Sequence, residues 1–338
     1  MNCRAITKML TITIGSDPEM FVLCGLEPYP AEKALGDTVA LGREELLKLP
    51  LGADPTAKFF FAELRPVPAK DPITHLRTIR DMMHRVPYTY KCPKGKKLSA
   101  IVPPAMEVTL PDGKKRVLSV GGHIHFGYDR AKAIKDRKEA KEKAKPIIDE
   151  IGTHEGKEFI EALLDTKKLR GNMARFLGYF AGVPYYLIEP QPEGRLRRER
   201  TKYGRMSNYR EQEYGIEWRM CSSWLFSPEI AGGILSLSYV VAFEYLQMPY
   251  IINYTQIRNL LRSRSLFMSL TKGISPEEAI KKPVTYDPAP YRMEYGVIKH
   301  IVRNFYLYPR YRREITRFFG LIDEYYTYSP YVNIIPNW

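Results

Sequence analysis

Cysteine and histidine are both scarce in this chain, which contains four cysteines and six histidines in 338 residues. The cysteines are scattered and form no CxxC pair, so the sequence predicts neither a disulfide framework nor a zinc knuckle. This cysteine usage is typical of a reducing compartment. We therefore expect a cytoplasmic protein.

Long apolar runs are also lacking. The start of the chain, MNCRAITKML, does not have the apolar length of a signal peptide. The most apolar segment, residues 230–246, contains Glu244 and is shorter than the roughly 20 residues that a membrane-spanning helix needs. We expect a buried core helix there and no membrane partner.

Basic residues, by contrast, are abundant. The 52 lysines and arginines against 38 acidic residues give a formal net charge of +14. Such a surface attracts nucleotides, nucleic acid or another anionic polymer, and it equally serves solubility and ion-pair networks. The charge therefore favours phosphate-rich partners without selecting one of them.

The apolar pattern predicts strands in the first two thirds of the chain and helices behind them. Strands are predicted over 9–15, 19–23, 57–64, 116–128 and 213–220. Helices are predicted over 71–86, 131–150, a stretch to about 186, and most of the chain beyond 228. Residues 192–210 are predicted to be a basic loop. Together these elements indicate an α+β fold.

In or next to four of the predicted strands, two polar residues stand at positions i and i+2. Side chains alternate along a strand, so the two members of each pair point to the same side of a sheet. The pairs are Asp17 and Glu19, Glu63 and Arg65, His123 and His125, and Glu217 and Arg219.

These pairs predict a cation and phosphate site if the four strands meet. Carboxylates that face one another repel unless a cation lies among them. Carboxylate oxygens with an imidazole suit Mg²⁺ or Mn²⁺ better than structural zinc, and neighbouring arginines suit a phosphoryl group. Taken singly, each pair has an ordinary alternative: a cross-strand ion pair for ExR, and a hydrogen-bonded histidine for HxH.

The motifs also resemble a known family. GSDPEMFV, GADPTAKFFFAELRPVPA, GGHIHFGY and RTKYGRMSNYREQEYGIEWRMCSSW occur in this order between residues 10 and 250. They are similar to the phage-type carboxylate–amine ligases of type 2 (amidoligases), in the glutamine synthetase and glutamate–cysteine ligase superfamily. The resemblance implies a curved, mostly antiparallel half-barrel sheet backed by helices. It also implies ATP, two or more Mg²⁺ or Mn²⁺ ions, and amide formation through an acyl phosphate.

The resemblance further implies roles for individual residues. The implied metal ligands are Asp17, Glu19, Asp54, Glu63, His123 and Glu217. The implied nucleotide or phosphate contacts are Arg65, His125, Arg200, Tyr203 and Arg210. The chemical step is assigned to Arg219, Arg210 and Glu217. Asp54 departs from the family pattern, because a proline follows it where the family usually has glycine.

We expect residues 1–255 to form the catalytic core and residues 256–338 a helical extension, rich in aromatics and arginine, packed on it. The expected substrates are a small-molecule or polymer-borne carboxylate and amine. One alternative function remains: a basic protein that binds nucleic acid or another anionic polymer on a ligase-like fold without catalysis. Its support is the arginine-rich stretch 195–210 and the mixed aromatics and arginines of 305–328, although an amphipathic helix that buries its aromatics explains the latter equally.

Overall fold

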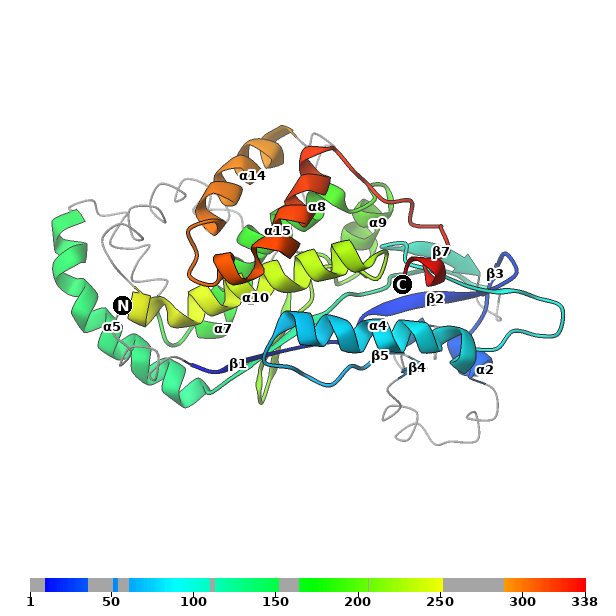
Figure 1. The fold of residues 1–338 in the computed structure, drawn as a ribbon, viewed down its shortest axis with the longest axis horizontal. Coiled ribbons are helices and arrows are strands. Elements are labelled where there is room, and N and C mark those ends of the chain that lie inside the picture. Colours follow the sequence, from blue (N-terminus) through cyan, green and yellow to red (C-terminus); the bar gives the residue numbers. More distant parts are fainter. Residues whose placement is uncertain are drawn as a thin grey trace.

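The structure is a computed structural model that describes residues 10–35, 51–53, 61–109, 113–151, 164–205, 207–251 and 289–338. Antiparallel sheets lie along one side of the molecule, and most of the helices are gathered on the other (Figure 1). The α+β prediction is confirmed at this level.

The first sheet brings three of the four motifs side by side. Its strand order is β1 (Ile12–Ser16), β9 (Ile124–Tyr128), β11 (Gly215–Trp218) and β10 (Tyr209–Gln212), all antiparallel. In this register His125 of β9 lies opposite Gly15 on one side and Glu217 on the other. Arg210 of β10 lies opposite Glu217. A row of polar residues therefore crosses the sheet.

The second sheet carries the remaining motif. It contains β2 (Glu19–Cys24), β3 (Glu27–Pro28), β4 (Leu51–Ala53), β5 (Phe61–Leu64) and β6 (Leu98–Ile101). Glu19 of β2 pairs directly with Glu63 of β5. The chain passes from the first sheet to the second at Asp17–Pro18, between the strands predicted over 9–15 and 19–23. A separate hairpin is formed by β7 (Met106–Thr109) and β8 (Lys115–Leu118).

Two sequence predictions of local structure are wrong. The strand expected over 116–128 is divided into β8 and β9, which belong to different sheets. The intervening Gly122 lies against the backbone of Ser222 and the ring of Trp224, where a Cβ would clash. The loop expected over 192–210 contains helix α9 (Glu193–Arg200). Its Arg197 is buried rather than solvated, and the guanidinium donates to the carbonyls of Met220 and Cys221.

Helix α10 (Pro228–Ile251) is the centre of the helical side. Among the described residues, α10 alone is long and apolar enough to cross a membrane. Of its apolar window, Pro228–Gln247, 94% is buried inside the protein, as expected for a core helix. The other helices are α2 (Ala31–Ala34), α4 (Pro72–Thr89), α5 (Arg130–Ile151), α7 (Leu169–Leu177), η2 (Gly178–Gly182), α8 (Val183–Ile188), α14 (Ala289–Val302), α15 (Tyr308–Asp323) and η3 (Ile335–Asn337).

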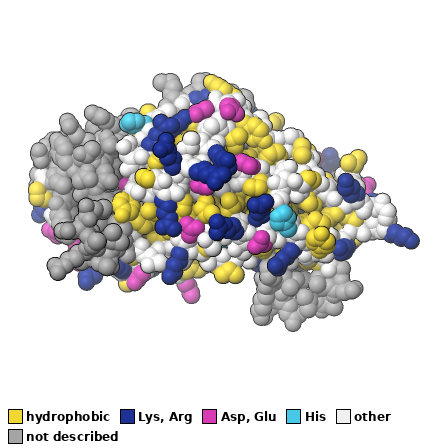
Figure 2. Space-filling model, viewed as in Figure 1, with side chains coloured by type: hydrophobic (Ala, Val, Ile, Leu, Met, Phe, Trp, Pro, Cys, Tyr) yellow, Lys and Arg dark blue, Asp and Glu magenta, His cyan; other side chains and the backbone are white. Residues whose placement is uncertain are grey.

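Helix α15 packs along α10 with an amphipathic face (Figure 1). Its aromatic residues Tyr311, Phe318 and Phe319 are buried, whereas Arg312 and Arg313 are exposed. This arrangement confirms the amphipathic-helix interpretation for this part of the tail. On the face shown in Figure 2, lysines and arginines are spread among other side chains and form no single stripe.

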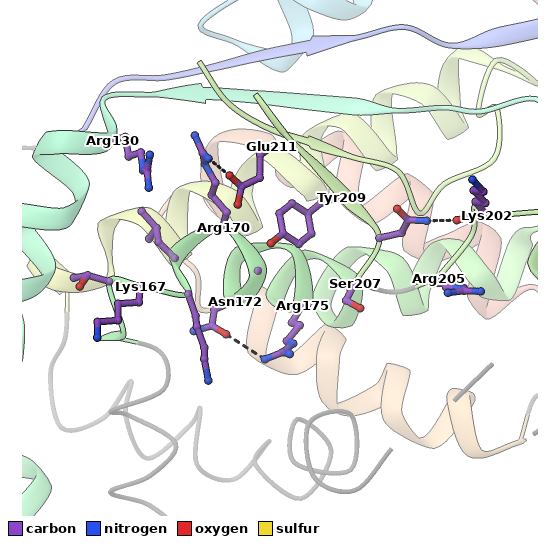
Figure 3. Close-up of a pocket in the computed structure, with 15 residues that line it drawn as sticks. Arg130, Lys167, Arg170, Asn172, Arg175, Lys202, Arg205, Ser207, Tyr209 and Glu211 are labelled. Atoms are coloured by element: carbon purple, nitrogen blue, oxygen red, sulfur yellow. Dashed lines mark hydrogen bonds and ion pairs between the residues drawn. The ribbon is translucent and has the colours of Figure 1, made fainter. Parts of the chain in front are cut away.

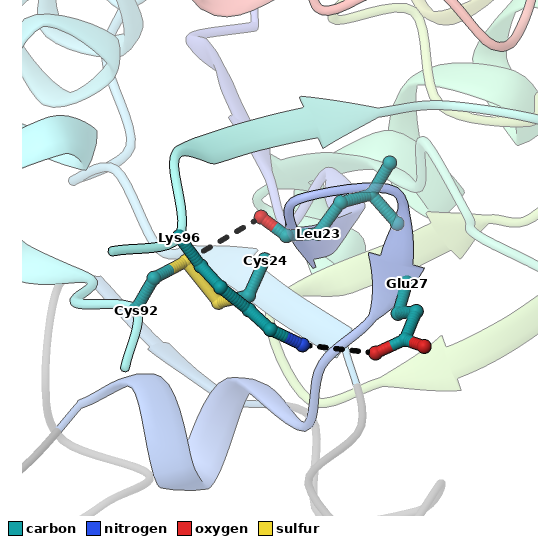
Figure 4. Close-up of a disulfide and its surroundings, with 5 residues drawn as sticks. All are labelled: Leu23, Cys24, Glu27, Cys92 and Lys96. Carbon is teal, nitrogen blue, oxygen red and sulfur yellow. Dashed lines mark hydrogen bonds and ion pairs between the residues drawn. A yellow bond between two sulfur atoms is a disulfide. The ribbon is translucent and has the colours of Figure 1, made fainter. Parts of the chain in front are cut away.

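A disulfide joins Cys24 at the end of β2 to Cys92 after α4 (Figure 4). The prediction that the cysteines form no disulfide is therefore wrong for this pair. The two residues are separated by 68 positions in sequence, and only the folded sheet brings their Cα atoms to 5.4 Å. An exposed ion pair between Lys96 and Glu27, at 3.0 Å, lies beside the bridge.

The α10–α15 contact predicts opposite effects for two glycine substitutions. A Cβ on Gly233 of α10 would lie closer than 3.0 Å to Phe318, so Gly233→Ala should lower the free energy of unfolding by about 1–3 kcal/mol. A Cβ on Gly320 of α15 would meet no other atom within 4 Å, so Gly320→Ala should be neutral or stabilising by up to about 1 kcal/mol. Urea unfolding of both variants measures this, and equal effects would contradict the packing.

His75 of α4 predicts a pH dependence of stability. Its ring is buried, Nδ1 donates to Val67 O at 3.2 Å, and Nε2 accepts from Ser16 Oγ at 2.8 Å. Burial lowers the pKa of His75 from 6.5 to about 4. The charge of His125 acts in the same direction, whereas the hydrogen bond to Val67 O opposes the shift. The unfolded chain therefore binds a proton that the folded protein does not, and stability is lost as pH falls from about 6.5 towards 4.

The size of this loss follows from about 1.4 kcal/mol per pKa unit. The stability difference between wild type and His75→Asn should therefore shrink by about 2–3 kcal/mol between pH 7.5 and 4.5, measured by urea unfolding at each pH. A difference that does not change with pH would show that His75 titrates normally in the folded protein.

Candidate functional site

Asp17 lies at the bend between β1 and β2, and backbone hydrogen bonds hold this bend against the chain that leads into β9. Asp17 N donates to His123 O at 3.4 Å, and Glu19 N donates to Gly121 O at 2.9 Å. The first and third motifs are thus joined directly by their backbones. Their side chains consequently face each other.

Asp17 forms a polar cluster with both histidines. Its Oδ1 is 3.2 Å from His123 Nδ1, and its Oδ2 is 3.3 Å from His125 Nε2. His123 Nδ1 is also 3.6 Å from Glu217 Oε1. Both imidazoles therefore point to the same side, as the HxH spacing predicted, although His123 lies just before the strand.

Glu217 is the most deeply buried member of this cluster, with no exposed side-chain surface. Its Oε2 accepts from Arg210 Nε at 2.6 Å and from Gln212 Nε2 at 2.8 Å. Its Oε1 lies 2.7 Å from Arg219 Nε. Two guanidinium groups thus compensate one buried carboxylate, which is the condition for keeping it charged.

The electrostatics of the cluster keep Asp17 ionised. Burial alone would raise the pKa of Asp17, but the neighbouring imidazoles of His123 and His125 outweigh it and hold the pKa well below its ordinary value. Burial works against the charged form of His125, and the contact with Asp17 outweighs it, so the pKa of His125 is raised. The cluster therefore presents a carboxylate at neutral pH.

Tyr203 covers the arginine side of the cluster. The Arg219 guanidinium lies 4.7 Å from the centre of the Tyr203 ring, and that ring is 5.5 Å from the His123 ring. Arg219 is mostly buried, with 21% of its side chain exposed. It is therefore fixed between a carboxylate and an aromatic face.

A second group of charges lies on the neighbouring sheet. Glu19 Oε2 accepts from Gly121 N at 2.6 Å, and Glu63 lies opposite Glu19 across the strand pair. Two carboxylates in this position repel each other. Arg65 forms an ion pair with Glu63 and also donates to Ala53 O at 3.0 Å. The Asp17–Glu19 segment connects this group to the first cluster.

Most of the predicted site residues are thus gathered into two connected groups. The first contains Asp17, His123, His125, Tyr203, Arg210, Glu217 and Arg219, and the second contains Glu19, Glu63 and Arg65. Arg200, at the exposed end of α9, forms no hydrogen bond or ion pair with either group within the described part of the chain. Asp54 lies outside the described residues.

The sequence reasoning missed three residues that support the cluster. Gln212 alternates with Arg210 on β10, so the same i, i+2 spacing would have found it. Tyr214, in the turn after β10, lies with its hydroxyl 3.0 Å from His125 Nδ1. Arg197 is fully buried and donates to Met220 O at 2.6 Å, which holds the chain after β11. No local sequence pattern predicts the positions of Tyr214 and Arg197.

Part of the first group has the geometry of a cation site. Asp17, His125 and Glu217 each offer one ligand atom, and these atoms all lie within 4.8 Å of one another. Asp17 Oδ1, His125 Nε2 and Glu217 Oε1 are buried and form no well-aligned hydrogen bond with the described residues. Two carboxylate oxygens and an imidazole fit a divalent cation. His125, rather than the predicted ligand His123, completes this three-residue set.

No curated protein sequence matches the chain. Among solved structures, a bifunctional glutathione synthetase from Pasteurella multocida aligns with a TM-score of 0.38 and 11% identity over 94% of this chain and 52% of its own. The chain thus spans about half the length of that protein.

The family comparison covers the segment that supplies the arginines, Tyr203 and Glu217. Residues 164–260 match the model of a family described as phage phiEco32-like COOH.NH2 ligase-type 2. This range runs from the start of α7 through α9, β10 and β11 to the end of α10. The resemblance to the type 2 carboxylate–amine ligases is therefore confirmed, and residues 164–260 carry the sequence signature of that family.

Proposed function

We propose that this protein is an ATP-dependent carbon–nitrogen ligase that joins a carboxylate to an amine through an acyl phosphate. The observation that carries the proposal is the buried Glu217 carboxylate, placed between the Asp17–histidine cluster and the guanidinium groups of Arg210 and Arg219. It combines a cation site with fixed positive charge, and Glu217 and both arginines lie inside the segment that matches the ligase family. Phosphoryl transfer requires both.

Divalent cations, Mg²⁺ or Mn²⁺, would be held by the two groups of acidic residues. Asp17, His125 and Glu217 form the set for one cation, with His123 beside them. Glu19 and Glu63, with Asp54, are the proposed ligands of a further cation. Cations bound there would neutralise the phosphates of ATP and polarise the transferring group.

The arginines supply the fixed charge. Arg219 cannot turn away easily, because Glu217 and the Tyr203 ring hold its guanidinium from two sides. Preorganised donors of this kind stabilise charge that develops on the oxygens of a phosphoryl group in transfer. Arg210 acts beside it, and Arg65, Arg200, Tyr203 and His125 are the proposed remaining contacts to nucleotide or phosphate.

The two chemical steps follow from the poor reactivity of a free carboxylate. A carboxylate oxygen attacks the γ-phosphorus of ATP, ADP leaves, and an acyl phosphate is formed. The amine nitrogen then attacks the acyl carbon, the C–O bond to phosphate breaks, and inorganic phosphate leaves. The proton that the amine loses passes to a carboxylate of the site, which acts as general base.

We also propose that the two sheets form the curved half-barrel of a glutamine synthetase-like fold, with residues 1–255 as the catalytic core and 256–338 as an extension. The continuity of the two sheets at Asp17–Glu19 supports the first proposal, since charged residues of both meet at that junction. The packing of α15 on α10 supports the second.

The cation site is tested by Asp17→Asn, which removes one negative charge and keeps the side-chain shape. Wild-type protein with Mg²⁺ and a non-hydrolysable ATP analogue should gain about 2.7 kcal/mol of stability at a hundredfold excess over Kd, seen as a rise in melting temperature. Asp17→Asn should lose most of this rise. Asp81→Asn, an exposed change on α4, is the matched control and should keep it. A full rise in Asp17→Asn would contradict the assignment.

The chemical step is tested by Arg219→Lys, which keeps a positive charge but loses the planar set of donors. Nucleotide affinity measured by calorimetry should change little, because other groups still hold the phosphates. Single-turnover phosphate release should fall on the order of 10²–10³-fold. The assay uses the carboxylate and amine found by screening Mg²⁺–ATP turnover against panels of both.

The control for this test is Arg313→Lys on the exposed face of α15, which should leave rate and affinity unchanged. Equal losses of affinity and rate in Arg219→Lys would show that Arg219 serves only as an ion-pair partner of Glu217 and does not stabilise the transferring phosphoryl group. Normal turnover in that variant would have the same meaning.

A further inference from the structure

A basic pocket of about 620 Å³ lies between α7, β10 and residues of the segments 202–205 and 207–208 (Figure 3). Seven basic residues line it. Arg170 pairs with Glu211, the acidic residue of the lining. The other six form no ion pair within the described part of the chain: Arg130, Lys167, Lys168, Arg175, Lys202 and Arg205.

This pocket is separate from the cation cluster because the two lie on opposite faces of β10. Arg210 and Gln212 of this strand point to Glu217. Tyr209 and Glu211, the alternate residues, line the pocket. Side chains of a strand alternate between the two faces of the sheet. A ligand in the pocket would therefore not touch Glu217.

The beginning of helix α7 adds a further positive element. The helix starts at Leu169, and its N-cap residue Lys168 provides no side-chain hydrogen bond to the first turn. Residues 167–171 all line the pocket. Free amide groups at a helix start carry a partial positive charge and bind phosphate oxygens. The helix start and the lysines before it therefore both attract anions.

Two arginines of the lining each have one unsatisfied nitrogen. Nε of Arg170 and Nε of Arg205 are buried and have no hydrogen-bond partner among the described residues. Like charges that converge on a partly enclosed space raise the energy of the protein unless an anion enters it. A pocket of this volume accommodates a ligand of nucleotide size.

We propose that this pocket is a second ligand site, which binds two or more adjacent phosphate groups of a free polyphosphate or nucleotide, or of a nucleic-acid strand. The six unpaired cations and the start of α7 hold the phosphates. The site lies next to the catalytic face, because Tyr203, which packs on Arg219, belongs to the same segment as Lys202 and Arg205. The proposal is independent of ligase activity.

The test uses the full chain in EDTA, so that cation-dependent nucleotide binding does not contribute. A fluorescein-labelled oligodeoxythymidine is titrated with protein, and its anisotropy is recorded at several salt concentrations. The variant Lys167→Ala/Lys168→Ala should weaken binding about tenfold or more and reduce the slope of log Kd against log salt by about 1–2. Both lysines are exposed, so folding should be preserved.

The matched control is Lys94→Ala/Lys97→Ala, which removes the same charge from exposed positions near the disulfide. It should bind as wild type does. Tripolyphosphate and ATP are then added as competitors. Displacement by either assigns the site to free polyphosphates or nucleotides, and displacement only by unlabelled oligonucleotide assigns it to a strand. Either result supports the site.

Two results would overturn the proposal. One is the absence of measurable binding by the wild-type protein at low salt. The other is an equal loss of affinity in the two double variants, because binding would then follow net charge and not this pocket.

Discussion

The charge of Glu217 governs the arrangement of the proposed catalytic face, which carries Asp17, His125, Arg210 and Arg219. A carboxylate with no exposed surface costs several kcal/mol of desolvation free energy unless positive groups surround it, on the order described for buried ions. Arg210 and Gln212 on β10 and Arg219 beyond β11 supply this compensation. The strand register is therefore constrained by electrostatics as well as by apolar packing, since a slip of one residue would send these side chains to the other face.

The same constraint explains why the face suits phosphoryl transfer. Glu217 has one oxygen occupied by Arg210 and Gln212, and the other oxygen faces Arg219 and the cluster of Asp17 and its imidazoles. Fixed positive and negative groups thus alternate over a short distance. Phosphoryl transfer needs bound cations and fixed donors around one reacting group, which is what this alternation provides. The pocket on the opposite side of β10 is lined by seven basic residues and one acidic residue, and it has a different chemistry.

The sequence predicted those features that depend on local spacing. The i, i+2 pattern placed His123 and His125 on one side, and the apolar periodicity predicted α4 and α10. Features that depend on distant segments were missed: the Cys24–Cys92 bridge, buried Arg197, and the pocket between α7 and β10. Each requires elements that approach only in the folded protein. A charged stretch is also ambiguous by itself. Arg197 belongs to a segment predicted to be a solvated loop, but it lies in a helix and is buried against two backbone carbonyls.

The central claim is that the carboxylates and histidines around Glu217 hold a divalent cation for ATP chemistry. Anomalous diffraction from crystals grown with Mn²⁺ and a non-hydrolysable ATP analogue tests it most directly. The account predicts an anomalous peak about 2.0–2.5 Å from oxygens of Asp17 and Glu217, with the terminal phosphate facing Arg219. The absence of an anomalous peak at these carboxylates, with manganese bound elsewhere or not at all, would contradict it.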